Sequence, residues 1–374
     1  MTSAEIDPIK VLIVDDSSSA RVMMRKIVES DPALSVQAMA QDAYSAARLM
    51  KEALPDVILL DLEMPGVDGI TFLKKIMAQR PLPVIICSSL TQSGSQRSVE
   101  AMEAGAVDVI LKPSMADAKV FQEASARICD AIHAAAQSNR APGRRLPRRA
   151  AAPVQPTAKL SADVILPPPN FSRPVPKTEP IVCIGASTGR TEALRVVLCA
   201  LPADAPGIVV VQHMPKGFTK AFADRLNSLA QIEICEAEDG MTVTQGRCII
   251  AAGDRHMLLR RGPSGYRVQV VEGESVSRHR PSADVLFRSG AAAGGANILG
   301  IIMTGMGDDG AQCLGEIKRA GGHTIAQDEA TCVVYGMPRE AVNLGHAKQV
   351  LPLGRLALSI TTFARMHEYH GAGS

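Results

Sequence analysis

Aromatic residues are scarce in this chain. Phe, Tyr and Trp together make up 3% of its 374 residues, and Trp is absent. Proteins that bind single-stranded nucleic acid by base stacking depend on such rings, so this class is disfavoured. The net charge is only +2, from 40 basic and 38 acidic side chains, which argues against a broad electrostatic surface for duplex DNA. We therefore expect no specific nucleic-acid partner.

Targeting and metal-binding signals are also missing. The first ten residues include Glu5 and Asp7, and no long apolar segment follows a basic start, so no secretory signal is expected. The longest uncharged stretch, residues 289–307, contains many glycines and predicts a helix end, a turn and a buried strand rather than a membrane insertion. The eight cysteines form no Cys-x-x-Cys pair, which disfavours a zinc site and predicts buried, reduced thiols in a cytoplasmic protein.

Proline and arginine are concentrated in the middle of the chain. Ten of the 24 prolines lie between Pro142 and Pro180, and five arginines lie between Arg140 and Arg149. This composition predicts an extended, solvated linker over 137–178, and contact of its arginines with an acidic partner or nucleic acid is the less favoured alternative. The sequence thus predicts one domain over 9–130 and a second over 179–365.

The first domain alternates apolar runs with segments of helical spacing, such as residues 20–30. Continuous apolar strands separated by helices predict an α/β domain with a parallel sheet covered on both faces. The expected strands are 10–14, 57–60, 84–87 and 107–111. Each is followed by a polar side chain, and sites in such sheets form where the strands end. These side chains are Asp15, Asp16, Asp61, Ser88 and Lys112.

Three carboxylates brought together there would repel one another unless a cation joined them. Asp15, Asp16 and Asp61 offer the oxygen ligands that Mg²⁺ prefers, while Ser88 and Lys112 offer a hydroxyl and a positive charge to a phosphoryl group. The chain has no P-loop, so a phosphate-accepting carboxylate is favoured over an NTPase. Helix capping by these acids is the alternative, but five suitable residues at matching strand ends favour a functional site.

These residues resemble those of response-regulator receiver domains, which have a flavodoxin-like (βα)5 fold. The resemblance rests on Asp15-Asp16, the run from Leu60 to Gly69, Ser88 and Lys112-Pro113. It implies that Asp61 accepts phosphate from a chemotaxis histidine kinase and that Ser88 and Lys112 sense the phosphate. Val109 departs from the aromatic residue common at its position. The implied Mg²⁺ ligands are Asp15, Asp16, Asp61 and the carbonyl of Glu63.

The second domain repeats the alternating pattern. Apolar runs 181–184, 207–211, 298–303 and 324–326 predict another parallel sheet. Three further runs suggest hairpins and therefore an inserted antiparallel section. These runs are 247–250, 257–261 and 266–271.

A candidate nucleophile follows the first of these strands. Ser187 lies in a Gly-x-Ser-x-Gly turn before a helix, although a Gly-Ser turn that merely caps the helix is an equally open reading. His213 follows the next strand as a candidate base, and Asp308 and Asp309 follow another as candidate partners of that base. Residues 305–310 also fit the Gly-x-Gly-x-x-Gly dinucleotide pattern, but two carboxylates would there face a pyrophosphate.

This domain resembles the catalytic domain of chemotaxis protein-glutamate methylesterases, which have a Rossmann-like fold. The resemblance rests on residues 184–189, 212–215, 280–287, 304–310 and 335–338. It implies a catalytic triad of Ser187, His213 and Asp309, with Asp309 rather than Asp308 as the acid. It also implies that the backbone N–H of Met306 stabilises the oxyanion and that Thr188 supports the site. Two residues depart from the family pattern, namely Arg190 and Cys332.

The two resemblances together imply a phosphorylation-activated serine hydrolase for sensory adaptation. Its substrates would be glutamate methyl esters on methyl-accepting chemotaxis receptors, with methanol released, and some family members also deamidate glutamine. Ester hydrolysis would need no metal, whereas phosphorylation would need Mg²⁺. The alternatives are a catalytically weak, phosphorylation-dependent adaptor, a regulator with a nucleic-acid effector domain, and a hydrolase of small metabolites.

Overall fold

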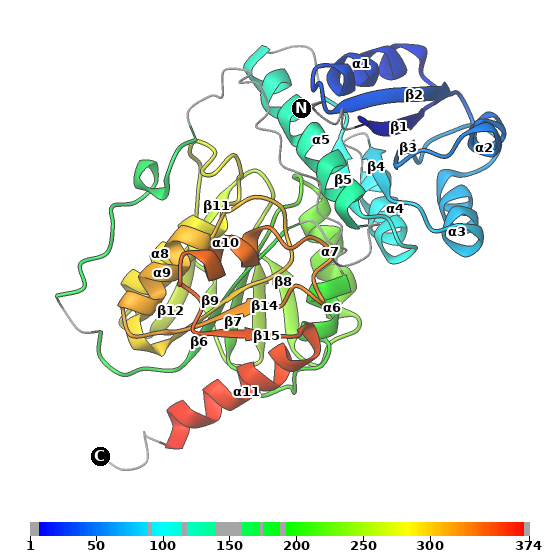
Figure 1. The fold of residues 1–374 in the computed structure, drawn as a ribbon. Coiled ribbons are helices and arrows are strands. Elements are labelled where there is room, and N and C mark those ends of the chain that lie inside the picture. The colour runs from blue at the N-terminus through cyan, green and yellow to red at the C-terminus, as the bar shows by residue number, and fades with distance from the viewer. Residues whose placement is uncertain are drawn as a thin grey trace. The chain divides into compact units, whose positions relative to one another are not determined.

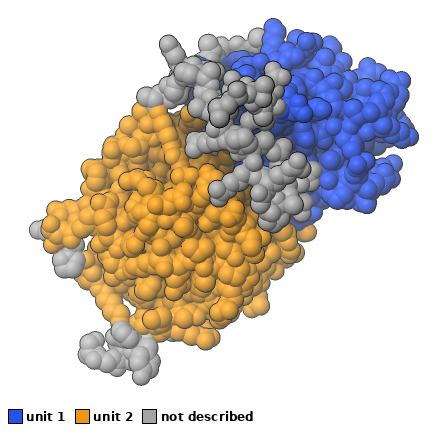
Figure 2. All heavy atoms as spheres, in the orientation of Figure 1, with its two compact units in different colours: residues 1–157 blue, residues 158–374 orange. Residues whose placement is uncertain are grey.

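A computed structural model describes residues 7–88, 92–113, 118–138, 159–172, 175–187 and 192–369. The chain divides into two compact units, residues 1–157 and 158–374, which Figure 2 distinguishes by colour.

Unit 1 contains a five-stranded parallel sheet with the strand order β2-β1-β3-β4-β5. This order is that of flavodoxin-like folds, so the predicted α/β architecture is confirmed. The strands are β1 (Ile9–Val14), β2 (Leu34–Ala40), β3 (Val57–Asp61), β4 (Val84–Ser88) and β5 (Asp108–Leu111). The helices are α1 (Ser18–Glu29), α2 (Ala43–Glu52), α3 (Gly69–Gln79), α4 (Gln92–Glu103) and α5 (Ala118–Ser138).

Local sequence explains where these elements begin. The central strands β3 and β4 are buried along their whole length, as expected of strands covered on both faces. The first three helices are capped by Ser17, Asp42 and Asp68, whose side chains accept hydrogen bonds from backbone N–H groups of the first turn. The strand β2 was not predicted, because it lies at the sheet edge and is mostly half-buried, with polar Ser35 and Gln37 interrupting its apolar pattern.

Unit 2 is built on a seven-stranded parallel sheet with the order β15-β14-β13-β6-β7-β10-β8. A separate three-stranded antiparallel sheet has the order β11-β12-β9. The main-sheet strands are β6 (Ile181–Ala186), β7 (Gly207–Gln212), β8 (Glu233–Glu236), β10 (Arg247–Ile250), β13 (Ile298–Ile302), β14 (His323–Gln327) and β15 (Gln349–Leu351). The strands of the small sheet are β9 (Thr242–Val243), β11 (His256–Gly262) and β12 (Gly265–Val271).

Helices cover these sheets, and α8 packs against both β6 and β11 (Figure 1). The helices are α6 (Glu192–Leu198), α7 (Phe218–Asn227), α8 (Ala283–Gly294), α9 (Ala311–Arg319), α10 (Met337–Asn343) and α11 (Leu353–Tyr369). The described part of the chain also contains the 3₁₀ helices η1 (Ala162–Val164) and η2 (Gly295–Asn297). None of the helices among the described residues is long and apolar enough to cross a membrane.

The predicted antiparallel section is confirmed in part. Strands β11 and β12 form an antiparallel hairpin, whereas the run 247–250 does not. It is the parallel strand β10, hydrogen-bonded between β7 and β8 in the main sheet. The error arose because an apolar run of four residues has no periodicity that separates parallel from antiparallel pairing.

The strand order brings three predicted site segments together. Strand β6 lies between β13 and β7, and all three run parallel. Their carboxyl ends therefore meet at one edge of the sheet, where Ser187, His213 and the loop 304–310 follow.

Candidate active site

Ser187 follows β6 and is held by its own backbone. Its N–H donates to the carbonyl of Thr304 (3.1 Å), and its carbonyl accepts from Nε2 of Gln212 (2.8 Å). A Cβ atom at Gly305 would lie 2.7 Å from Cβ of Ser187 and would also collide with the sulfur of Met337. Only glycine fits there, so the backbone of the 304–310 loop comes directly against the serine.

His213 is fixed beside this serine by the sheet. Its N–H donates to the carbonyl of Ala186 across the neighbouring strand ends (3.1 Å). Its Nε2 atom lies 2.7 Å from Oδ2 of Asp309, and its Nδ1 atom is buried with no hydrogen-bond partner among the described residues. The ring is stacked on that of His279, with centroids 3.7 Å apart and an interplanar angle of 7°. The free nitrogen for proton exchange is therefore Nδ1.

Asp309 is buried and is held by the N-terminus of α8. Its carboxylate accepts from the hydroxyl of Ser282 (2.7 Å) and from the backbone N–H groups of Ala283 (2.7 Å) and Asp284 (3.2 Å). Burial alone disfavours the charged form, but His213, His279 and Ser282 hold the pKa of this carboxylate below its usual range. It is thus an anion that orients the imidazole and stabilises its positive charge.

Asp308 lies elsewhere. Its side chain is 51% exposed and forms a surface ion pair with Lys159. The structure therefore brings Asp309, and not its neighbour, to His213.

Four other residues noted in the sequence differ in how far the structure describes them. Thr188 and Arg190 lie outside the described residues. Met306 follows Gly305 in the loop beside the serine. Burial raises the pKa of the Cys332 thiol to about 12, so this sulfur stays protonated near neutral pH and is no competing nucleophile.

Sequence reasoning missed several residues that support the triad. His279 stacks on His213, Ser282 and Asp284 contact Asp309, and Gln212 holds the backbone of Ser187. Ser282 and Asp284 lie in the segment 280–287, which was noted for its resemblance but given no role. Nothing local in the sequence signals the stacking of two histidines 66 positions apart (279 − 213).

Unit 1 carries a second cluster at the ends of β1 and β3. Carboxylate oxygens of Asp15, Asp16 and Asp61 lie within 4.8 Å of one another. Nζ of Lys112 lies 2.7 Å from Oδ2 of Asp15 and 2.7 Å from Oδ2 of Asp61. Burial raises the pKa of Asp15 despite this contact. The two carboxylates raise the pKa of Lys112 although burial opposes it.

This cluster fits a hard divalent cation. Three oxygen donors converge, and one positive side chain already offsets part of their charge. The N–H of Glu63 donates to Oδ1 of Asp61 (3.1 Å), which holds the start of the loop after β3 against this carboxylate. Ser88 ends the neighbouring strand, and its carbonyl accepts from the N–H of Lys112 (3.0 Å). Val109 is buried in β5.

Comparison with known proteins identifies the family. Residues 182–360 match the family model for CheB methylesterase, and residues 11–123 match that for the response regulator receiver domain. A curated relative from Cereibacter sphaeroides, "Protein-glutamate methylesterase/protein-glutamine glutaminase 1", is 60% identical over 98% of both chains. The chain belongs to the CheB methylesterase family.

Other CheB relatives are similar along most of their length. "Protein-glutamate methylesterase/protein-glutamine glutaminase 2" of Rhodospirillum rubrum is 56% identical over 94% of this chain and 97% of its own. The crystal structure of the Thermotoga maritima CheB methylesterase catalytic domain is 37% identical, covering 49% of this chain and 97% of that chain, with a TM-score of 0.47.

Proposed function

We propose that unit 2 hydrolyses glutamate methyl esters on methyl-accepting chemotaxis receptors and releases methanol. The observation that carries this proposal is the pairing of His213 with the buried Asp309 beside Ser187. The 60%-identical relative from Cereibacter sphaeroides carries the name of both a methylesterase and a glutaminase, so deamidation of receptor glutamines belongs to the same proposal.

The hydrolysis proceeds in two steps. Oγ of Ser187 attacks the ester carbonyl while Nδ1 of His213 takes its proton, and Asp309 stabilises the resulting imidazolium through Nε2–H. The imidazolium returns the proton to the departing methoxide, and methanol leaves. Water then cleaves the acyl-enzyme by the same route and restores glutamate. The backbone N–H of Met306 and the side chain of Thr188 are the proposed supports of the oxyanion.

Unit 1 regulates this reaction by phosphorylation. Asp61 accepts a phosphoryl group from a chemotaxis histidine kinase, and Ser88 and Lys112 contact the phosphate. Bound Mg²⁺ would offset charge on the phosphoryl group, with Asp15, Asp16, Asp61 and the Glu63 carbonyl as its ligands. Because the methyl esters lie on cytoplasmic helices of the receptors, we place the protein in the cytoplasm.

The test is methanol release from methylated chemoreceptor by the full chain with a phosphodonor and Mg²⁺. Release is expected from the intact protein and should vanish in Ser187→Ala. A known esterase acting on the same receptor is the positive control. No release from the intact protein, with a working control, would favour an adaptor. Release that survives Ser187→Ala would remove the assigned nucleophile.

A further inference from the structure

The segment 160–166 belongs to unit 2 and packs against its core, although it precedes the first strand of the catalytic sheet by fifteen or more residues. We call this segment the brace. Ala162 and Leu166 are buried, and Ile165 packs against the hydrophobic core beside Gly273. The 3₁₀ helix η1 forms its middle and is capped by the side chain of Ser161. The brace is therefore a docked part of the catalytic unit.

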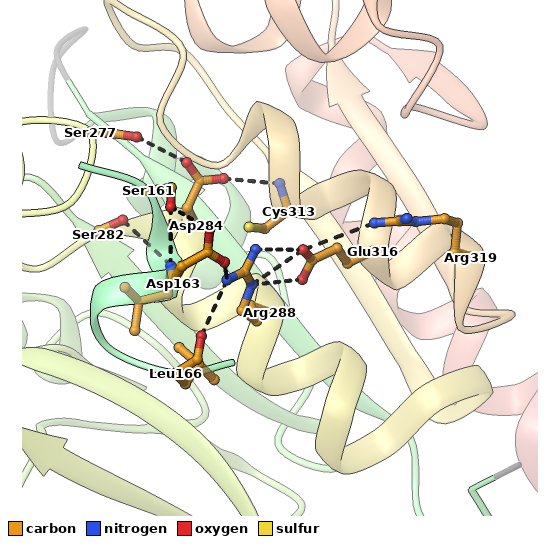
Figure 3. Close-up of polar contacts among 11 residues, drawn as sticks. Ser161, Asp163, Leu166, Ser277, Ser282, Asp284, Arg288, Cys313, Glu316 and Arg319 are labelled. Atoms are coloured by element: carbon orange, nitrogen blue, oxygen red, sulfur yellow. Dashed lines mark hydrogen bonds and ion pairs between the residues drawn. The ribbon is translucent and has the colours of Figure 1, made fainter. Parts of the chain in front are cut away.

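Arg288 joins the brace to two helices (Figure 3). This α8 residue is 7% exposed, and its guanidinium donates to both carboxylate oxygens of Glu316 on α9, at 2.8–3.2 Å. The same guanidinium donates to the carboxylate of Asp163 and to the carbonyl of Leu166 (3.2 Å). A buried cation held by two carboxylates and a carbonyl fixes the relative positions of all three segments.

The brace also holds the turn that carries His279. The carbonyl of Leu160 accepts from the N–H of Ser277 (2.9 Å). Ser277 lies in a tight turn closed by two backbone hydrogen bonds between Val276 and His279, of 2.8 and 3.0 Å. Ser277 and Arg278 have positive φ angles of 52° and 68°, a backbone state that non-glycine residues keep only when neighbouring contacts hold it.

From this turn, contacts continue to the catalytic acid. The hydroxyl of Ser277 donates to Oδ2 of Asp284 (3.0 Å), and Oδ1 of Asp284 accepts from the N–H of Cys313 (2.9 Å). The N–H of Asp284 in turn donates to Asp309. Ser277 thus connects Leu160 of the brace with two parts of the site. It reaches Asp309 through Asp284, and it lies in the turn that carries His279.

We propose that the brace is a positioning element of the active site. By holding Ser277 and Arg288, it keeps His279 against His213 and keeps the N-terminus of α8 against Asp309. It contacts no reacting atom itself, so its loss should lower kcat rather than weaken receptor binding. This inference rests on the esterase function proposed above.

Asp163→Ala in the full chain is the direct test. The Asp163 side chain is 57% exposed and Arg288 keeps Glu316, so the variant is expected to fold. We expect kcat for methanol release to fall roughly 10- to 100-fold, the range that follows from small misplacement of catalytic groups, with KM unchanged. Asp163→Glu, which keeps the carboxylate, should recover most of the rate. Asp224→Ala, which removes a similarly exposed aspartate paired with Lys220, is the matched control and should leave kcat unchanged.

A double variant separates positioning from general loss of structure. Ser277→Gly removes the hydroxyl while glycine tolerates the positive φ, and it should lower kcat by a similar factor. Because both substitutions release the same turn, the Asp163→Ala/Ser277→Gly variant should lose no more than the larger single variant. Three outcomes would each overturn the proposed positioning role. The two single-variant losses in kcat could multiply in the double variant, kcat could be unchanged in Asp163→Ala, or the loss of activity could simply follow unfolding at the assay temperature. If the intact protein releases no methanol while a known esterase acts on the same receptor, the failure lies instead in the proposed esterase function.

Discussion

Nε2 of His213 lies 2.7 Å from Oδ2 of Asp309, and the two side chains are only 4% and 0% exposed. Because water is excluded from this contact, the charge of Asp309 acts on the imidazole with little screening. The orientation and charge of the imidazole therefore depend strongly on the negative charge of Asp309 and on its position.

Neutralising the buried acid should nearly abolish turnover. Asp309→Asn keeps the shape of the side chain but removes the anion that orients His213, so kcat should fall on the order of 10³- to 10⁴-fold. Asp308→Asn is the matched control, since the side chain of Asp308 is exposed and pairs with Lys159 rather than with His213. Methanol release measures both, and equal losses in the two variants would contradict the assignment of the acid.

A side chain at Gly305 should damage the serine's environment. In Gly305→Ala the new methyl group would collide with Met337 and press on Cβ of Ser187, so kcat should fall by about 10-fold or more. Gly354→Ala, in the first turn of α11, meets no atom within 4 Å and should leave kcat unchanged while raising Tm slightly. Wild-type kcat in Gly305→Ala would show that the loop does not constrain the nucleophile.

Asp284 should give the catalytic unit an unusual dependence of stability on pH. Burial, followed by the charge of Asp309, raises the pKa of this carboxyl from 3.8 to about 7. The folded protein then holds the proton more tightly than the unfolded chain, so this group's contribution to the free energy of unfolding falls as pH rises from 3.8 to about 7. This is the reverse of the trend for a carboxylate stabilised as an anion.

Asp284→Asn isolates that contribution. The amide can accept from the N–H of Cys313, and it can bond to the hydroxyl of Ser277 with the donor and acceptor roles exchanged. Its Tm relative to wild type should rise between about pH 4 and about pH 7, as calorimetry would measure. Asp224→Asn controls for the loss of one exposed negative charge. A difference in Tm that stays flat or falls over this range would contradict the raised pKa.

Replacing the phosphate acceptor should separate regulation from catalysis. Asp61→Asn should abolish stimulation of methanol release by a phosphodonor and leave the basal rate unchanged, because the triad lies in the other unit. Asp56→Asn, just before the opposite end of β3, should retain stimulation. Stimulation of Asp61→Asn would mean that another residue accepts the phosphate.

Lys112 should weaken cation binding at the acidic cluster. Its ammonium group contacts Asp15 and Asp61, two of the proposed Mg²⁺ ligands. Lys112→Ala should therefore bind Mg²⁺ more tightly, by roughly 3- to 30-fold, and Asp16→Asn should bind it more weakly. Calorimetric titration of the full chain with Mg²⁺ measures both. Weaker binding in Lys112→Ala would show that the lysine supports the cation indirectly.

Much of this fold was predictable because its central strands are buried on both faces. The apolar runs before Asp61 and Ser187 are continuous, and each ends in a polar residue where parallel strands form sites. Edge strands carry a weaker signal, so β2, β8 and β15 were missed. The interior strand β10 was misassigned for a different reason, because its short apolar run does not show the direction of pairing. Residues of the candidate site that lie on strand ends were found in the same way.

The supporting contacts were not predictable because they join distant parts of the chain. Ser282 reaches Asp309 across 27 positions, and Arg288 reaches Asp163 across 125. None of these residues alters the pattern of polar and apolar residues in its own segment, so no local signal indicates the contact. The proline-rich composition around the brace suggested a solvated linker. Composition alone does not show which apolar residues of such a segment pack against a folded domain.

The position of the brace has a practical consequence for truncation. It lies before residue 182, where the match to the CheB methylesterase family begins. A fragment cut at that residue would keep all seven strands of the main sheet except the first residue of β6, yet it would strip one carboxylate from Arg288 and uncover the surface under Ala162 and Leu166. The shortest fully active esterase fragment should therefore start near Ala158. The contacts of the brace, and not the first residue that matches the family model, determine where this fragment must begin.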